Sequence, residues 1–249
     1  MTNIAANLEA VRSRINAACR DARRDPGEVT LLAVSKTCPI EAIRQAVDAG
    51  QRHFGESYWQ EAQSKLTNLS GLELDWHFIG PLQSNKTRVI ASNFAWVHGV
   101  DRLKLAERLS EQRPPELPPL QVCVQVNISG EASKSGVLPV AAGELCRAVA
   151  RLPGLRLRGL MAIPEPSQNA ELLRSRFAGV RRLQERLNAE GLGLDTLSMG
   201  MSDDLELAIL EGANIVRVGT AIFGERRHET SQVPHANPSN ANPSNASPL

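Results

Sequence analysis

The chain has 249 residues, with 28 Lys+Arg against 27 Asp+Glu, so its formal net charge is +1. This balance gives no electrostatic reason to expect a nucleic-acid-binding or membrane-surface protein. Hydrophobic residues at 42% and charged residues at 22% are close to globular averages and exclude wholesale disorder. No apolar run approaches the roughly 18 residues of a spanning helix, and the first residues do not build a signal-peptide core. We therefore expect a cytoplasmic protein.

The first predicted element is an amphipathic helix. Its apolar positions, Leu8, Val11, Ile15 and Ala18, are spaced three or four residues apart, and the turn sequence Asp25-Pro26-Gly27 follows them. We expect an extra N-terminal helix that packs against the main fold.

From residue 30 onward, short β-branched runs alternate with longer amphipathic stretches, which is typical of parallel βα units. The eight strand candidates span residues 30–35, 52–55, 76–79, 95–98, 120–128, 157–161, 196–199 and 215–218. Helical stripes lie between them, for example at Ile40, Ile43 and Val47. The pattern predicts an α/β fold, a single-domain TIM-type (β/α)8 barrel. The second and fourth candidates are short, so a doubly wound open sheet with fewer strands is the alternative.

Two segments fall outside this alternation. The proline-rich residues 113–119 predict a stiff loop before the fifth strand. Residues 230–249 are dominated by Asn, Pro, Ser and Ala, with NPSNA twice in tandem, and predict a disordered tail behind a barrel domain of residues 1–229.

Cysteine and histidine spacing limits the possible chemistry. The four cysteines include no C-x-x-C pair and are interpreted as reduced thiols. The five histidines show no H-E-x-x-H spacing, so we expect no catalytic metal held by the protein.

A barrel places its active site at the carboxyl ends of its strands, and Lys36 directly follows the first apolar strand. A partly desolvated lysine there would expose a neutral amine to a carbonyl group, as a Schiff base requires. The alternative is a lysine that reaches out of the barrel mouth or pairs with an acid.

The turns after the seventh and eighth strands offer hydroxyl and backbone donors. Ser202 lies in the first turn, and Gly219 and Thr220 lie in the second. In barrels these loops often bind phosphate, although an ordinary helix N-cap beside a glycine turn has the same residues. Together with Lys36 they match the aldehyde and the phosphate of pyridoxal 5'-phosphate.

Six motifs carry a family resemblance, and they occur in order along almost the whole predicted barrel. They are AVSKT at 33–37, HFGES at 53–57, WHFIGPLQSNK at 76–86, RGLMAI at 158–163, SMGMSDD at 198–204 and RVGTAIFG at 217–224. With them the chain resembles the YggS/PROSC-type pyridoxal phosphate homeostasis family. The resemblance implies a barrel like the N-terminal domain of alanine racemase, which binds the cofactor covalently in vitamin B6 supply without an established catalytic reaction.

By this resemblance, Lys36 would form the internal aldimine, Ser202, Gly219 and Thr220 would hold the phosphate, and Arg217 would face the pyridine nitrogen. Strand alternation independently points Arg217 away from its valine neighbours and into the barrel. A fixed guanidinium charge there disfavours protonation of the ring nitrogen and weakens the cofactor as an electron sink. The alternative for Arg217 is a pair with an acid such as Glu56 or Asp203.

Three further positions are assigned to the cofactor site. Ser57 stands where the family commonly has Asn, so any role of that position is altered. His77 is expected to line the pocket rim without a catalytic role. Met201, like Met161, is a candidate to pack against the cofactor ring, although methionine at a barrel end is more often core filler.

Two functions from different classes follow. The first is a carrier that captures pyridoxal phosphate reversibly and releases it to client enzymes. The second is a pyridoxal-phosphate enzyme acting on amino acids, such as a racemase, for which Tyr58 is the single tyrosine available as a second base. Other B6 vitamers are possible ligands, and a monomer is favoured because the second domain of the racemases is missing. A third class, an RNA- or protein-binding module, is suggested only by the arginines of one predicted helix, which we interpret as a solvated face: Arg174, Arg176, Arg181, Arg182 and Arg186.

Overall fold

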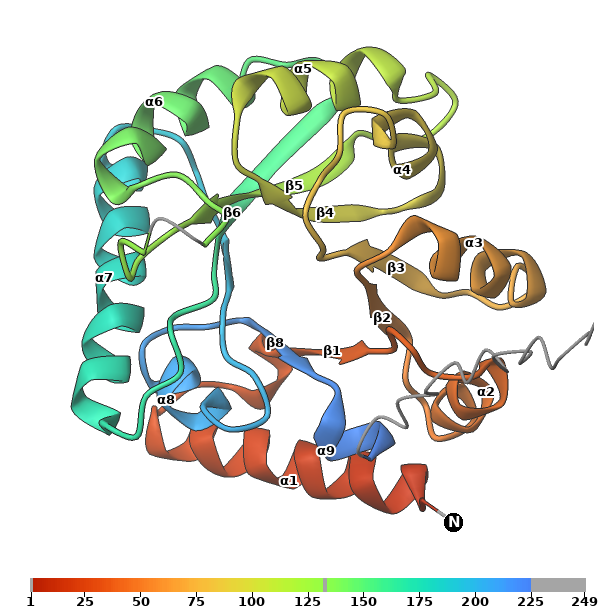
Figure 1. Ribbon diagram of the computed structural model, residues 1–249. Helices are drawn as coiled ribbons and strands as arrows, with labels where there is room; N and C mark the ends of the chain where they lie inside the picture. Colours follow the sequence, from red (N-terminus) through yellow and green to blue (C-terminus); the bar gives the residue numbers. More distant parts are fainter. Residues whose placement is uncertain (1, 132–133, 225–249) are drawn as a thin grey trace, which may run out of the picture.

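The computed structural model describes residues 2–131 and 134–224, and it contains a closed barrel of eight parallel strands in chain order. The ring of strands is surrounded by helices (Figure 1). The strands are β1 Thr30–Val34, β2 His53–Glu56, β3 Asp75–Phe78, β4 Trp96–Val100, β5 Leu120–Val126, β6 Leu155–Ala162, β7 Thr196–Ser198 and β8 Ile215–Val218. The barrel prediction is therefore confirmed, and the open-sheet alternative is wrong because β1 pairs with both β2 and β8.

The helices between the strands follow the predicted apolar stripes. They are α2 Ile40–Asp48, α3 Trp59–Asn68, α4 Thr87–Asn93, α5 Leu103–Gln112, α6 Pro139–Val149, α7 Ala170–Ala189 and α8 Leu205–Leu210, and a last helix, α9 Thr220–Phe223, follows β8. A short 3-10 helix, η1 Pro26–Glu28, precedes β1. The predicted proline-rich loop is also present, since α5 ends at Gln112 and β5 begins at Leu120.

The extra N-terminal helix is α1, Ile4–Asp21. The Asn3 side chain caps it by accepting a hydrogen bond from the Ala6 N–H, which satisfies one donor of the first turn. The predicted stripe is buried, and the helix packs against α2, α8 and α9. It thus covers the barrel where the chain closes, next to β1 and β8 (Figure 1).

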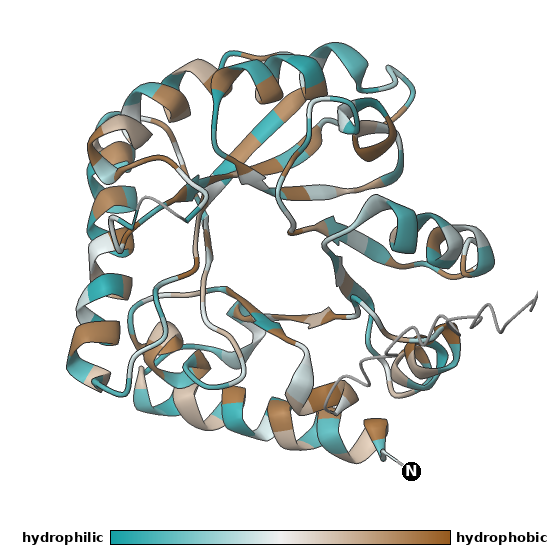
Figure 2. Cartoon of the chain, viewed as in Figure 1, coloured by the Kyte–Doolittle hydropathy of each residue, from teal (hydrophilic) through white to brown (hydrophobic). Residues whose placement is uncertain are grey.

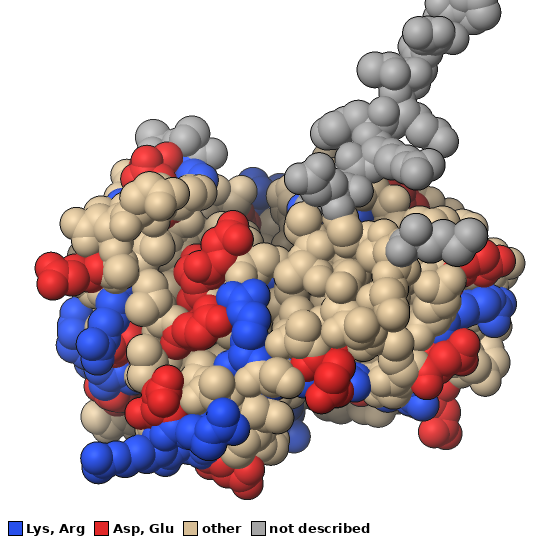
Figure 3. All heavy atoms as spheres, turned by 90° about the horizontal axis from the view of Figure 1, so that it is seen from below, with Lys and Arg blue, Asp and Glu red and all other residues tan. Residues whose placement is uncertain are grey.

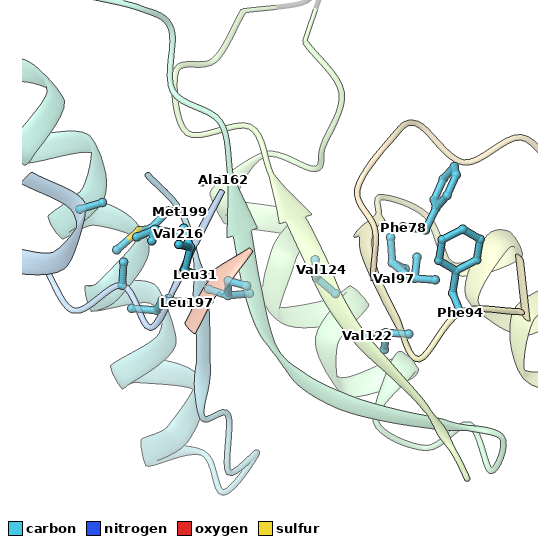
Figure 4. Close-up of a cluster of buried hydrophobic side chains, with 14 of the residues drawn as sticks. Leu31, Phe78, Phe94, Val97, Val122, Val124, Ala162, Leu197, Met199 and Val216 are labelled. Carbon is cyan, nitrogen blue, oxygen red and sulfur yellow. The ribbon is translucent and has the colours of Figure 1, made fainter. Parts of the chain in front are cut away.

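The hydrophobic core lies between the outer faces of the strands and the helices. Hydrophobic and hydrophilic segments alternate around the helices (Figure 2), as a structure with one buried stripe per helix requires. Outward-facing strand residues such as Val97, Val124, Leu197 and Val216 belong to this core (Figure 4). The inner faces of β3, β4, β7 and β8 instead supply buried polar side chains, namely His77, His98, Ser198 and Arg217.

The surface carries both signs of charge. On the face seen from below in Figure 1, basic and acidic side chains are interspersed (Figure 3). On α7, Arg174 and Arg181 both pair with Glu211, and Arg176 pairs with Glu165. Ion pairing of this kind is typical of a solvated face and gives no support to RNA binding.

Among the described residues, no helix has both the length and the apolar character needed to cross a membrane. The predicted tail at 230–249 and the end of the predicted domain at 229 lie outside the described residues.

Candidate functional site

All strands of the barrel are parallel, so their carboxyl ends meet at one mouth. The predicted site residues outside the strands follow four of these ends. Lys36 comes two residues after β1 and Ser57 directly follows β2. Met201 and Ser202 follow β7, and Gly219 and Thr220 follow β8.

The pairing of β1 with β8 brings the Lys36 turn beside the Gly219 turn. Ala33 is paired with Val218, one residue before Gly219. A Cβ added to Gly219 would lie 3.3 Å from the Val34 carbonyl oxygen, so the two turns are in close contact. The Arg217 N–H also donates to the Gly200 oxygen (2.9 Å), which joins the turn after β7 to β8. The turns after β1, β7 and β8 therefore share one side of the mouth.

The backbone around Lys36 is held from both sides. Ser35 donates its N–H to the Gly55 oxygen (3.0 Å), and Thr37 donates its N–H to a carboxylate oxygen of Glu61 (2.8 Å). Thr37 has a φ of +64°, a conformation that costs free energy for a residue with a branched Cβ. Lys36 itself is half-buried. Contacts from β2 and α3 thus fix the chain on each side of this lysine.

A buried ion pair supports the same turn. The Lys65 ammonium lies 2.8 Å from Glu56 Oε1 and donates to the Ser35 carbonyl oxygen at 2.7 Å. The Ser35 hydroxyl donates to the same carboxylate oxygen of Glu56 at 2.5 Å. Both charged side chains are almost completely buried, and Glu56 Oε2 has no hydrogen-bond partner among the described residues. Burial raises the pKa of Glu56, and Lys65 opposes that shift.

The turn after β7 is shaped by a glycine, a hydrogen bond to a carboxylate and one ion pair. Gly200 has a φ of +93°, in the region that favours glycine. The Met201 N–H donates to Asp204 Oδ1 at 2.6 Å, and burial raises the pKa of that carboxyl group. From α1, Arg14 donates to the Ser202 carbonyl oxygen at 2.8 Å while it pairs with Glu206. Met201 and Ser202 are half-buried.

The turn after β8 leads directly into α9. The Gly219 carbonyl oxygen accepts hydrogen bonds from the N–H groups of Ile222 and Phe223, both at 2.9 Å. Thr220 is the first residue of α9 and is exposed. The turn therefore presents a hydroxyl and backbone N–H groups at the mouth, beside the Lys36 turn.

Arg217 points into the barrel, as strand alternation predicts. Its guanidinium donates through Nη1 to the Ser198 hydroxyl (2.8 Å) and to the Ser198 carbonyl oxygen, and through Nη2 to the Ala162 carbonyl oxygen (2.8 Å). It is 4% exposed, and burial lowers its pKa to about 10, so it stays charged at neutral pH. Within residues 2–131 and 134–224 it forms no ion pair, so the predicted alternative of a Glu56 or Asp203 partner is not observed.

Two predicted positions lie deeper than expected. Ser57 is 9% exposed and packs against the backbone of Gly80, where a Cβ would overlap its carbonyl oxygen. His77 is 1% exposed and lies inside the barrel, with His98 3.0 Å from one ring nitrogen and His53 3.4 Å from the other. It does not lie on an open rim. Contacts of these two residues with a cofactor remain predictions.

Sequence reasoning missed several residues that build the site. Lys65 resembles any surface lysine of an amphipathic helix, and Arg14 lies off the apolar stripe of α1. His98 and Ser198 follow strand alternation, but no local motif links β4 to β7. The one sequence signal that could have linked His98 with Ser198 was strand alternation, which points both side chains into the barrel.

Comparison with known proteins defines first the class and then the family. Residues 6–227 match the family model described as alanine racemase, N-terminal domain. The pyridoxal phosphate homeostasis protein of Pseudomonas aeruginosa is 61% identical over 226 residues, which cover 91% of this chain and 97% of that protein. The Escherichia coli K12 protein of the same name is 52% identical over 236 residues, with 91% and 98% covered. The chain belongs to the pyridoxal phosphate homeostasis protein family.

Solved structures agree with this assignment. PipY of Synechococcus elongatus, solved with PLP bound, has 38% sequence identity and a TM-score of 0.78, covering 89% of this chain and all of that chain. An alanine racemase of Clostridium difficile, at 15% identity and a TM-score of 0.73, shares the fold over 91% of this chain and 58% of its own. This chain therefore has the same barrel fold as part of that alanine racemase.

Proposed function

We propose that this chain binds pyridoxal 5'-phosphate through Lys36 and holds it reversibly as part of vitamin B6 homeostasis. The observation that carries the proposal is the meeting of the Lys36 turn with two donor-rich turns at one barrel mouth, above the buried guanidinium of Arg217. The binding of PLP by PipY, a relative of 38% identity, supports the same ligand.

The donor set fits the three polar ends of this cofactor. Lys36 supplies the amine for the aldehyde, and Ser202, Gly219 and Thr220 supply hydroxyl and N–H donors for the phosphate. When bound, pyridoxal phosphate supplies an aldehyde that condenses with amines and a ring that withdraws electrons. Ser57, His77 and Met201 complete the proposed contacts.

Arg217 favours holding over turnover. A guanidinium that stays charged at neutral pH can donate a hydrogen bond to a ring nitrogen but does not give up its proton. Its charge opposes a second positive charge on that nitrogen. The ring then withdraws electrons weakly, so the site retains the cofactor without promoting carbanion chemistry.

The test is covalent trapping at Lys36. The purified protein is incubated with pyridoxal phosphate and reduced with borohydride, and the modified peptide is identified by mass spectrometry. We expect the label on Lys36 and loss of the visible absorption band in Lys36→Ala. Lys104→Ala, an exposed lysine of α5, is the matched control and keeps both. An unchanged band in Lys36→Ala contradicts the assignment.

The cell biology of this site is also proposed. We infer that the protein acts in the cytoplasm as a monomer, also binds other B6 vitamers, and delivers the cofactor to client enzymes. Transfer from loaded protein to an apo-enzyme, followed by recovery of that enzyme's activity, tests delivery. Light scattering of the purified protein tests the monomer.

A racemase-like activity is the second candidate, and Tyr58 is the observation in its favour. This side chain follows β2 at the same mouth and is 52% exposed, so it is available to a ligand there. Exchange of the alpha proton is measured with a panel of amino acids in deuterated water, using the loaded protein and Tyr58→Phe. Sustained exchange that Tyr58→Phe removes would establish the enzyme, whereas the carrier proposal expects none.

A further inference from the structure

A line of polar side chains runs through the interior of the barrel below Arg217. His98 Nδ1 lies 2.8 Å from the Ser198 hydroxyl that accepts from Arg217. His98 Nε2 lies 3.0 Å from His77 Nδ1, and His77 Nε2 lies 3.4 Å from His53 Nδ1. The rings of His77 and His98 each make one contact through Nδ1 and another through Nε2. The result is one continuous chain from the carboxyl mouth to β2.

The far end of this chain meets solvent. His53 is the first residue of β2, so it lies at the amino-terminal mouth, and 37% of its side chain is exposed. It borders a cavity of about 410 Å³ between α1 and the first two strands, which Arg12 and Arg52 also line. Asp75, the first residue of β3, places a carboxylate oxygen 3.4 Å from His53 Nδ1. A proton can therefore reach His53 from water.

The two central histidines, His77 and His98, are neutral, so the direction of the hydrogen bond on one side of each ring fixes the direction of the hydrogen bond on the other side. His77 and His98 are 1% and 0% exposed, and burial keeps the pKa of each well below its usual range. A neutral imidazole carries one N–H donor and one acceptor nitrogen. Each ring that donates on one side must therefore accept on the other, and the whole chain has only two arrangements.

The two ends favour opposite arrangements. Arg217 is charged and can only donate, so it favours a Ser198 hydroxyl that passes its own proton on toward His98 Nδ1. His98 then donates to His77, and His77 donates to His53. A protonated His53 carries a proton on Nδ1. When it donates that proton to His77, His77 and His98 accept at Nε2 and carry their own protons on Nδ1.

We propose that Ser198 and His98 are positioning residues for Arg217, and that the charge of His53 at the opposite mouth sets the direction of the hydrogen bond they make to it. With His53 neutral, each hydrogen bond is donated in the direction from Arg217 toward His53, and the Ser198 oxygen is a strong acceptor for the guanidinium. With His53 protonated, the chain reverses, and His98 competes with Arg217 for the same oxygen. The relevance of this relay to a cofactor rests on the proposed function, but the relay itself belongs to the protein alone.

The first experiment needs no cofactor. Ring-nitrogen NMR shifts are recorded for protein labelled with ¹⁵N-histidine through the titration of His53, in the wild type and in His53→Gln. We expect the His98 proton to move from Nε2 to Nδ1 at the midpoint of the His53 titration, and no such change in His53→Gln. A His98 tautomer that stays constant in the wild type, or that changes equally in His53→Gln, overturns the relay.

The second experiment tests positioning with a matched pair of amides. An asparagine side chain at 98 places its amide near the former Nδ1 and keeps the contact to Ser198, whereas glutamine places its amide near the former Nε2 and keeps the contact to His77. In protein loaded with pyridoxal phosphate, we expect His98→Gln to shift the visible band. We expect His98→Asn to keep the band at its wild-type position but to lose the pH dependence that the contact with His77 transmits. Equal effects of both variants, with Lys36 still labelled, refute positioning through Ser198 while leaving the proposed function intact. Loss of labelling at Lys36 in the wild type refutes the proposed function instead.

Discussion

The two buried histidines make the fold sensitive to mild acid. His77 and His98 are enclosed by the barrel, and burial lowers the pKa of His98 to about 3. In the unfolded chain each has a pKa of roughly 6.5. Below that value the unfolded state binds a proton that the folded state refuses, so stability is lost as the pH falls. The contribution of His98 is lost from about pH 6.5 down to the pKa of the folded state.

The size of the effect follows from proton linkage. Each histidine that is protonated only in the unfolded state lowers the free energy of unfolding by about 1.4 kcal/mol per pH unit. Glu211, whose pKa is lowered, contributes below roughly pH 4.5, whereas Glu56, whose pKa is raised, contributes above that value and with the opposite sign. A comparison of the wild type with a His98 variant between about pH 6 and pH 5 cancels these carboxyl contributions.

The assay is urea unfolding followed by tryptophan fluorescence across this window, for the wild type and His98→Asn. The variant is less stable at neutral pH by about 1–3 kcal/mol, since its neighbours lose part of their hydrogen bonding. Its stability should nevertheless fall less steeply with acid than that of the wild type, by about 1.4 kcal/mol per pH unit. Parallel pH dependences for the two proteins would mean that His98 is already protonated in the folded state, and the reasoning fails.

Three further outcomes follow from the packing. Lys65→Met leaves the buried Glu56 carboxylate without its cation and should lower the free energy of unfolding by about 3–5 kcal/mol, which the double variant with Glu56→Leu should largely restore in denaturant titrations. Gly159→Ala should prevent stable folding, because its Cβ would overlap the Thr196 carbonyl oxygen, whereas Gly71→Ala, where a Cβ meets open space, should melt like the wild type. In the native protein, a thiol reagent should modify the half-buried Cys38 quickly and the three buried cysteines only after unfolding, since burial raises the pKa of both Cys123 and Cys146 to about 12. Rapid modification of more than one thiol in the native state would contradict the last expectation.

The sequence by itself determined the elements and their class. Strand β8 lies at the predicted β-branched run, and helix α2 lies at the predicted three-and-four spacing of apolar residues, because apolar patterning reports local geometry directly. The short second and fourth strands left the topology open. Only β1, paired on both sides, closes the barrel, and that pairing depends on contacts between residues almost 200 positions apart in the chain.

The candidate site divides in the same way. Lys36, Arg217 and the two donor turns were predictable because each follows or ends a strand, and parallel strands end at one mouth. What holds them was decided by the tertiary structure alone. Lys65 contacts Ser35 from helix α3, and His98 on β4 contacts Ser198 across the barrel, 100 residues away in the sequence. A side chain's burial, partner and charge state are properties of its neighbours in space, and a linear pattern does not contain them.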